Sequence, residues 1–210
     1  MATTDRRLRE RAARRSLITS TARGIAEREG WDAVTTRRLS TEIEYSQPVL
    51  YRHFASMEDI AEAVALEGFG ELTESIAAAR IAAETPEDAL DRVARAYGTF
   101  AAENPALYDA MFTRCTQLRF AAPDSPAPVA AAFAELRAAV AALAGGRPVE
   151  TLTEVMWAAL HGLATLGRNH RLSPGHEADR LELLVGQFRD ERRPQQPNSD
   201  WVAGAGFEPA

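Results

Sequence analysis

Apolar residues recur every three or four positions in a series of segments, which is the spacing of one buried face of an α-helix. The first clear segment is 17–30, and its pattern stops at Gly30, a residue type that often follows a helix. Two short segments follow at 35–43 and 46–54, and each opens on hydroxyl residues that favour a helix N-terminus. Three helices, the last two short and closely joined, are the outline of a helix-turn-helix.

The remainder of the chain also predicts helices. Several of its segments open on N-terminal signals, such as Ser56 with Asp59, and Thr85 followed by proline. The predicted helices cover residues 56–83, 85–102, 104–119, 129–144, 149–168 and 177–189. No segment has the alternation of a strand, so the sequence predicts an all-α fold.

Composition narrows the class of protein. The 210 residues are 46% hydrophobic and 26% charged, which is typical of a globular chain. The single cysteine, Cys115, excludes an internal disulfide framework and fits a reducing compartment. No secretory signal or bilayer-length apolar run is evident. We therefore expect a cytoplasmic protein with no membrane partner.

Charge is unevenly distributed along the chain. The net charge is −6, yet residues 1–55 hold eleven arginines and seven acidic residues, so this part carries +4 and the rest −10. A basic region on an acidic chain indicates a polyanionic partner for that region. The basic arm Arg6–Arg15 fits contact with phosphates or a minor groove, and it fits a solvated terminal charge run equally well.

One segment carries a specific motif. It runs from Thr35-Thr36-Arg37-Arg38-Leu39 through Ser46-Gln47-Pro48-Val49-Leu50-Tyr51-Arg52-His53-Phe54. It resembles the helix-turn-helix of the TetR family of bacterial repressors. The resemblance implies a three-helix DNA-binding domain, here 1–55 with the basic arm, followed by a helical ligand-binding and dimerisation domain, 56–193. Residues 194–210 lack periodicity and are expected to be disordered.

Physical chemistry gives these residues roles in binding DNA. Gln47 can pair with adenine and Val49 can touch a thymine methyl group, whereas Tyr51 and His53 suit phosphate oxygens. Thr35 can offer its hydroxyl and a backbone N–H to a phosphate. The alternative is a solvated helical surface. The candidate DNA-binding residues are Thr35, Thr36, Arg37, Ser46, Gln47, Pro48, Val49, Tyr51, Arg52 and His53.

Two positions depart from the family pattern. Glu44 stands in the turn where the family usually has glycine, and a positive φ there costs a non-glycine residue about 1–2 kcal/mol. We therefore expect a slightly different turn. Met57 stands where the family usually has a lysine that touches phosphate, so one cationic contact is missing.

A second resemblance lies in the acidic part. The segment 104–112, with Trp157, His161 and Gly162 later, looks like the C-terminal domain of one TetR subgroup. Trp157 and His161 share a helix face, and Gly162 permits close helix approach. Aromatic side chains could wall an effector pocket, or they could be ordinary core. The candidate ligand-binding residues are Tyr97, Phe100, Tyr108, Phe112, Trp157 and His161.

The sequence thus predicts a DNA-binding transcriptional regulator. The resemblance implies that it is a ligand-released repressor that binds a palindromic operator as a homodimer, with the last two helices forming the interface. No enzymatic activity, cofactor or metal is expected, because the histidines lack metal-ligand spacing and nothing marks Cys115 as a nucleophile. The alternatives are an all-helical enzyme acting through His161 and a small-molecule-binding module without a DNA role.

Overall fold

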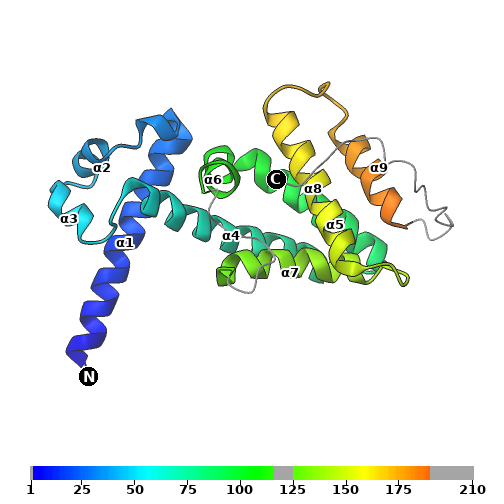
Figure 1. The fold of residues 1–210 in the computed structure, drawn as a ribbon, viewed down its shortest axis with the longest axis horizontal. Helices are drawn as coiled ribbons and strands as arrows, with labels where there is room; N and C mark the ends of the chain where they lie inside the picture. The colour runs from blue at the N-terminus through cyan, green and yellow to red at the C-terminus, as the bar shows by residue number, and fades with distance from the viewer. Residues whose placement is uncertain (1, 116–124, 190–210) are drawn as a thin grey trace, which may run out of the picture.

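A computed structural model describes residues 2–115 and 125–189 (Figure 1). All regular elements of these residues are helical, which confirms the all-α prediction. The molecule is elongated, with α1 to α3 at one end and α8 and α9 at the other. None of the helices in this part of the chain is long and apolar enough to cross a membrane.

The basic end, called the head below and taken as residues 2–55, consists of α1 (Ala2–Glu29), a 3-10 turn η1 (Trp31–Ala33), α2 (Thr36–Glu42) and α3 (Gln47–Tyr51). Its core is formed by fully or nearly fully buried side chains, among them Ile18, Ala22, Ile25, Leu39, Leu50 and Phe54. The predicted arm is not a separate segment, because the helix already begins at Ala2. Figure 1 shows these first turns projecting beyond α2 and α3.

Helix α3 differs from its prediction in two ways. It ends at Tyr51 instead of Phe54, although the Phe54 N–H still donates to the Leu50 carbonyl at 3.0 Å. The Ser46 side chain makes no capping hydrogen bond. Pro48 has no N–H to offer it, and the Val49 N–H donates to the Ser46 backbone carbonyl at 2.9 Å instead.

The turn between α2 and α3 keeps a left-handed residue. Glu44 has φ 56°, a conformation that glycine adopts with the least strain. The turn therefore has the left-handed backbone conformation that favours glycine, although glutamate occupies the position.

The other part, called the body below and taken as residues 56–189, is assembled around α4 (Met57–Ile81). Ser56 and Thr85 cap their helices as predicted, each accepting a hydrogen bond from the aspartate N–H three residues on, at 3.1 Å. The remaining body elements are α5 (Pro86–Glu103), α6 (Pro105–Asp109), η2 (Ala110–Arg114), α7 (Ala127–Ala141), α8 (Val149–Arg168) and α9 (Glu177–Arg189). The bounds of α8 and α9 are those predicted.

Other predicted boundaries are wrong or lie outside the described residues. The helix expected over 104–119 stops being α-helical after Asp109 and continues as the π-helical turn η2, which ends at Arg114. Helix α7 begins at Ala127, two residues before the predicted start, because its proline at position 128 fits the first turn. Residues 116–119 of the predicted 104–119 helix and all of the 194–210 tail lie outside the described residues.

Helices α4 and α6 approach each other closely at Gly68. A Cβ atom there would lie 2.8 Å from both the Leu107 Cδ1 and the Met111 Sδ. The absence of a side chain at Gly68 therefore allows α6 and η2 to lie directly against α4.

Candidate nucleic-acid interface and buried aromatic core

Helix α3 is held by one face and exposes the other. Leu50 and Phe54 are 2% and 4% exposed and anchor it in the core of the head. The other side chains of residues 46–53 are exposed or half-buried, namely Ser46, Gln47, Pro48, Val49, Tyr51, Arg52 and His53. The structure thus leaves the predicted DNA-binding residues of this segment at least partly accessible.

Helix α2 lies next to α3. The Thr35 hydroxyl caps α2 by accepting a hydrogen bond from the Arg38 N–H at 3.2 Å. The Thr36 and Tyr51 hydroxyls are 3.3 Å apart and join α2 to α3, whereas Arg37 stays exposed. Met57 is half-buried and packs against the core, so it offers no substitute for a cation at this position.

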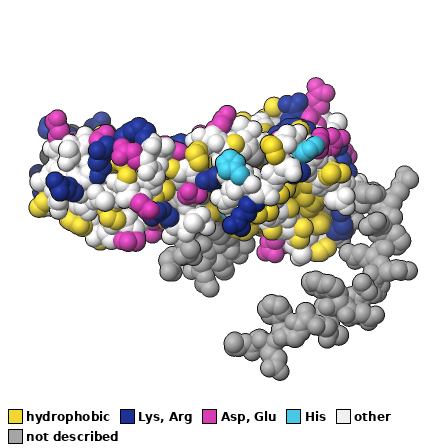
Figure 2. All heavy atoms as spheres, turned by 90° about the horizontal axis from the view of Figure 1, so that it is seen from above, with side chains coloured by type: hydrophobic (Ala, Val, Ile, Leu, Met, Phe, Trp, Pro, Cys, Tyr) yellow, Lys and Arg dark blue, Asp and Glu magenta, His cyan; other side chains and the backbone are white. Residues whose placement is uncertain are grey.

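The arginines of the head divide into two groups. Several form ion pairs with acidic side chains, as Arg28 does with Glu42 and Arg38 with Glu29. In the part of the chain that the structure describes, five others have neither an ion pair nor a hydrogen bond through their side chains: Arg7, Arg11, Arg14, Arg37 and Arg52. In Figure 2, blue side chains gather over this end of the molecule.

The positive charges of α1 and α3 converge on His53. Burial lowers the pKa of His53, and the charges of Arg14, Arg11, Arg15 and Arg52 lower it further. The Arg15 guanidinium donates to the His53 carbonyl and lies 4.0 Å from the centroid of the Phe54 ring. His53 is therefore a neutral imidazole at neutral pH, set in a cationic surface that can attract phosphates.

The body holds a connected chain of polar side chains in its aromatic core. The Tyr97 and Tyr108 hydroxyls are 2.8 Å apart, and the Tyr108 hydroxyl is 2.7 Å from the His161 Nδ1. The His161 Nε2 is 3.4 Å from the Thr165 hydroxyl. Burial raises the pKa of Tyr97 to about 12 and also raises that of Tyr108, whereas burial and the charge of Arg168 lower the pKa of His161. Every member is uncharged at neutral pH.

An apolar cavity of about 30 Å³ lies beside this chain, between α4, α5, η2, α7 and α8. Of the predicted ligand-binding residues, Tyr97, Phe112 and Trp157 line it. The rings of Tyr108 and His161 contact Phe112 in tilted arrangements, with centroids 4.6 Å and 4.9 Å from its own, and Phe100 lies in the core. Sequence reasoning missed the lining residues of α4 and α7, among them Phe69, Leu72, Ala132 and Phe133.

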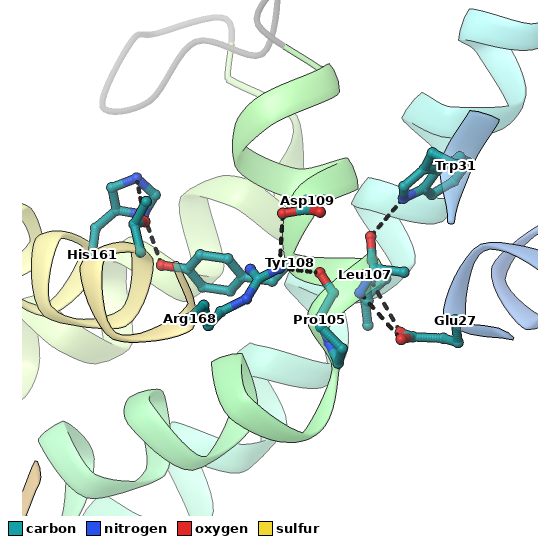
Figure 3. A network of polar contacts seen from close by, with 10 residues as sticks. Glu27, Trp31, Pro105, Leu107, Tyr108, Asp109, His161 and Arg168 are labelled. Carbon is teal, nitrogen blue, oxygen red and sulfur yellow. Dashed lines mark hydrogen bonds and ion pairs between the residues drawn. The ribbon is translucent and has the colours of Figure 1, made fainter. Parts of the chain in front are cut away.

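Helix α6 connects the aromatic core with the head (Figure 3). The Glu27 carboxylate accepts hydrogen bonds from the Ala106 and Leu107 N–H groups at 3.1 Å, and the Trp31 indole donates to the Ala106 carbonyl at 2.7 Å. Tyr108 points to the opposite side, toward α8. One short helix is therefore fastened to α1 and η1 on one side and to His161 on the other.

Arg168 fixes the same helix from α8. Its guanidinium donates to the Pro105 carbonyl at 2.8 Å and to the Asp109 carboxylate at 2.9 Å, and it lies 5.2 Å from the centroid of the Tyr108 ring. Sequence reasoning did not identify Glu27, Trp31 or Arg168 as functional. Their role comes from partners at least 59 residues away, which periodicity does not reveal.

The last two helices leave apolar surface uncovered. Val155, Leu166 and Leu183 are 53%, 39% and 69% exposed, and Figure 2 shows apolar side chains on this end of the molecule. Between α8 and α9 lies an open groove of about 610 Å³ with α5 as its floor. A Cβ atom at Gly162 would meet nothing within 4 Å, so the close approach that this glycine permits is not made inside the described protomer.

The described residues contain no group of three His, Cys, Asp or Glu side chains that could hold a metal ion. Cys115 ends η2 half-buried, and burial, with the nearby charge of Glu62, raises the pKa of its thiol to about 11.

Comparisons with known proteins agree with this architecture. Residues 18–64 match the model of bacterial regulatory proteins, tetR family, and residues 90–188 match that of the tetracyclin repressor-like C-terminal domain. The chain is 30% identical over 157 residues to the uncharacterized HTH-type transcriptional regulator Rv0681 of Mycobacterium tuberculosis, covering 72% of this chain and 69% of that protein. Its fold is similar to that of a protein of unknown function from Rhodococcus sp. RHA1 (TM-score 0.67, 24% identical, 83% of this chain and 92% of that chain). It is also similar to that of the TetR family regulator PfmR from Thermus thermophilus (TM-score 0.61, 19% identical, 84% of this chain and 99% of that chain).

Proposed function

The chain belongs to the TetR family of bacterial transcriptional regulators, and from this premise we propose that it is a repressor that binds a palindromic operator as a homodimer and is released by a small-molecule effector. The observation that carries the proposal is the set of arginines without ion pairs around α3. A protein that leaves these charges uncompensated on a rigid helical surface is suited to a polyanion of fixed geometry.

Dimerisation is proposed through α8 and α9. Their exposed apolar side chains and the groove between them would be covered by the same helices of a second copy, which would form a four-helix interface. The open position at Gly162 supports a close helix crossing there. In such a dimer, two α3 helices about 34 Å apart would enter successive major grooves.

The arm is proposed to add phosphate contacts. Arg7, Arg11 and Arg14 are spaced by four and three residues, so they share one face of α1, and Arg11 and Arg14 bring their charge to His53. This face would extend the cationic surface of α3 and offset the missing lysine at position 57. Changing all three to alanine should lower the slope of log affinity against log salt by up to about five in a dimer.

Release is proposed to act through α6. An effector in the cavity would press on Phe112 of η2, and η2 continues directly into α6. A shift of α6 would disturb its hydrogen bonds with Glu27 and Trp31 and so change the orientation of the head. Differential affinity of the effector for the two arrangements is sufficient for such a switch.

The proposal is tested by measuring binding to DNA from the region upstream of the gene at several salt concentrations. Affinity should fall steeply with salt, and Arg52→Ala should lower the slope by about two per dimer, one contact from each protomer. Arg171→Ala, which removes an exposed arginine from the body, is the matched control and should leave the slope unchanged. Affinity that does not depend on salt would favour a binding module without a DNA role.

A further inference from the structure

We infer that the cavity beside Tyr97 is a binding site for small, uncharged and largely apolar molecules about the size of one ring, and that the effector belongs to this class. The inference rests on the proposed effector-released function, which it deepens. It is carried by the eleven residues that line the cavity, since no charged side chain is among them in the part of the chain that the structure describes.

The hydrogen-bonding groups on the wall are already engaged. The Tyr97 hydroxyl is hydrogen-bonded to the Tyr108 hydroxyl at 2.8 Å. The Tyr108 hydroxyl is in turn hydrogen-bonded to the His161 Nδ1, and the His161 Nε2 lies 3.4 Å from the Thr165 hydroxyl, so each polar group along the chain has a partner. A ligand with several polar groups would find no free partners and would bury them unpaired, which is unfavourable.

A charged ligand would also lack a counter-ion. The cationic group described beside this chain is Arg168, which lies over the ring of Tyr108 and is held by Asp109 and the Pro105 carbonyl. It does not line the cavity. A carboxylate or ammonium group bound there would lose its hydration without gaining a partner, and burying an isolated charge is far more costly than burying a neutral group.

The space available limits the size of the ligand. A volume of about 30 Å³ is enough for only two or so water-sized spheres, so a ring must displace side chains. Phe112, Phe133 and Trp157 are only half-buried, whereas the lining residues of α4 are buried. Movement of Phe112, which lies on η2, is therefore the direct way to admit one ring.

Three probes of equal size test the charge requirement: benzyl alcohol, benzoate and benzylammonium, each titrated into the full-length protein at neutral pH. Binding is followed by the thermal midpoint and by tryptophan fluorescence, with Trp157→Phe used to assign the fluorescence change to the cavity. Benzyl alcohol should bind at millimolar concentrations and at least about tenfold tighter than either ion. Equal or tighter binding of benzoate or benzylammonium would overturn the inference, as would failure of benzyl alcohol to bind.

Two variants locate the binding. Ala132→Leu fills the cavity from α7 and should abolish binding of benzyl alcohol, whereas Ala131→Leu adds the same atoms on the exposed side of α7 and should leave it unchanged. If Ala132→Leu does not fold, Leu72→Ala enlarges the cavity instead and should tighten binding several-fold. Equal binding by the cavity and control variants would contradict the site.

The operator complex separates this inference from the proposed function. Benzyl alcohol that binds in the cavity without weakening the operator complex would contradict effector release and leave the ligand class of the cavity standing. Release of operator DNA by benzoate but not by benzyl alcohol would overturn the inference while supporting effector release.

Discussion

The head and the body treat their polar side chains in opposite ways. In the head, several arginines around α3 are exposed and form no ion pair with an acidic side chain. In the body, tyrosine, histidine and threonine side chains are linked into one uncharged chain inside the core. Uncompensated surface charge suits a large polyanion, whereas a satisfied, neutral interior suits a small apolar ligand. Helix α6 of the body is the element that is hydrogen-bonded both to the head and to the aromatic core.

The contrast predicts which changes alter stability and which alter binding. Side chains on the outer face of α3 have few neighbours, so their loss should affect a partner more than the fold. Side chains around α6 are buried and contact several elements, so their loss should lower the free energy of unfolding.

The largest effect is expected from a matched pair of leucine truncations. Leu107→Ala in the body removes a fully buried side chain and should lower the free energy of unfolding by about 2–5 kcal/mol. Leu8→Ala in the head removes a side chain that is 60% exposed and should change it by less than about 0.5 kcal/mol. Urea denaturation measures both, and similar losses in the two variants would contradict the contrast.

A change at the tip of α3 should alter DNA recognition and leave the fold intact. Gln47 is exposed at the first position of α3, so its amide is available to a base edge. Gln47→Ala should change discrimination at one position of each half-site by about 1–3 kcal/mol, with the urea midpoint unchanged. Binding to a panel of single-base operator variants measures this. An unchanged preference would show that Gln47 does not read a base.

A smaller effect is expected at the two strained residues, one in each region. Glu44 and His170 have φ 56° and 53°. Replacing either by glycine relieves a left-handed conformation and should raise the free energy of unfolding by about 0.5–1 kcal/mol, after the entropy that glycine loses. Glu44→Gly also removes a negative charge beside α3, so it alone should raise DNA affinity. An equal change in affinity for both variants would contradict this interpretation.

The smallest effect is expected from pH. The pKa of His161 is lowered by burial and by Arg168, so below about pH 6.5 the unfolded chain binds a proton that the native imidazole resists. Stability should therefore be full above that pH and decline as the pH falls toward the lower native pKa. His161→Gln should weaken this decline in thermal melts, and His53, whose pKa is also lowered, should supply the rest. Substitution of the exposed His176 by glutamine is the control.

Local features of the fold were predictable from sequence. Thr35, Ser56 and Thr85 cap their helices because the capping hydrogen bond joins residues three apart, a distance that any short window contains. The amphipathic patterns of 149–168 and 177–189 gave the bounds of α8 and α9 because uninterrupted helices end where the pattern ends.

Features that depend on distant contacts were not predictable. The carboxylate of Glu27 caps α6 from 79 residues away, so the sequence around either partner gives no indication of the contact. The change to a π-helical turn after Asp109 occurs where α6 and η2 pack against α4 at Gly68, a contact with a distant segment of the chain. The α4 and α7 walls of the cavity were missed for the same reason, because aliphatic residues at helical spacing look alike whether they line a cavity or fill a core.

The reaction rate of the half-buried Cys115 thiol, at the end of η2, can report movement of η2. Cys115 is the single cysteine of the chain, and with a pKa of about 11 only about one thiol in ten thousand is a reactive thiolate at neutral pH. Alkylation of the native protein should therefore be slow, and its rate should rise when η2 moves and the thiol becomes solvated. Timed labelling with a maleimide thus reports the position of η2 without any amino-acid substitution.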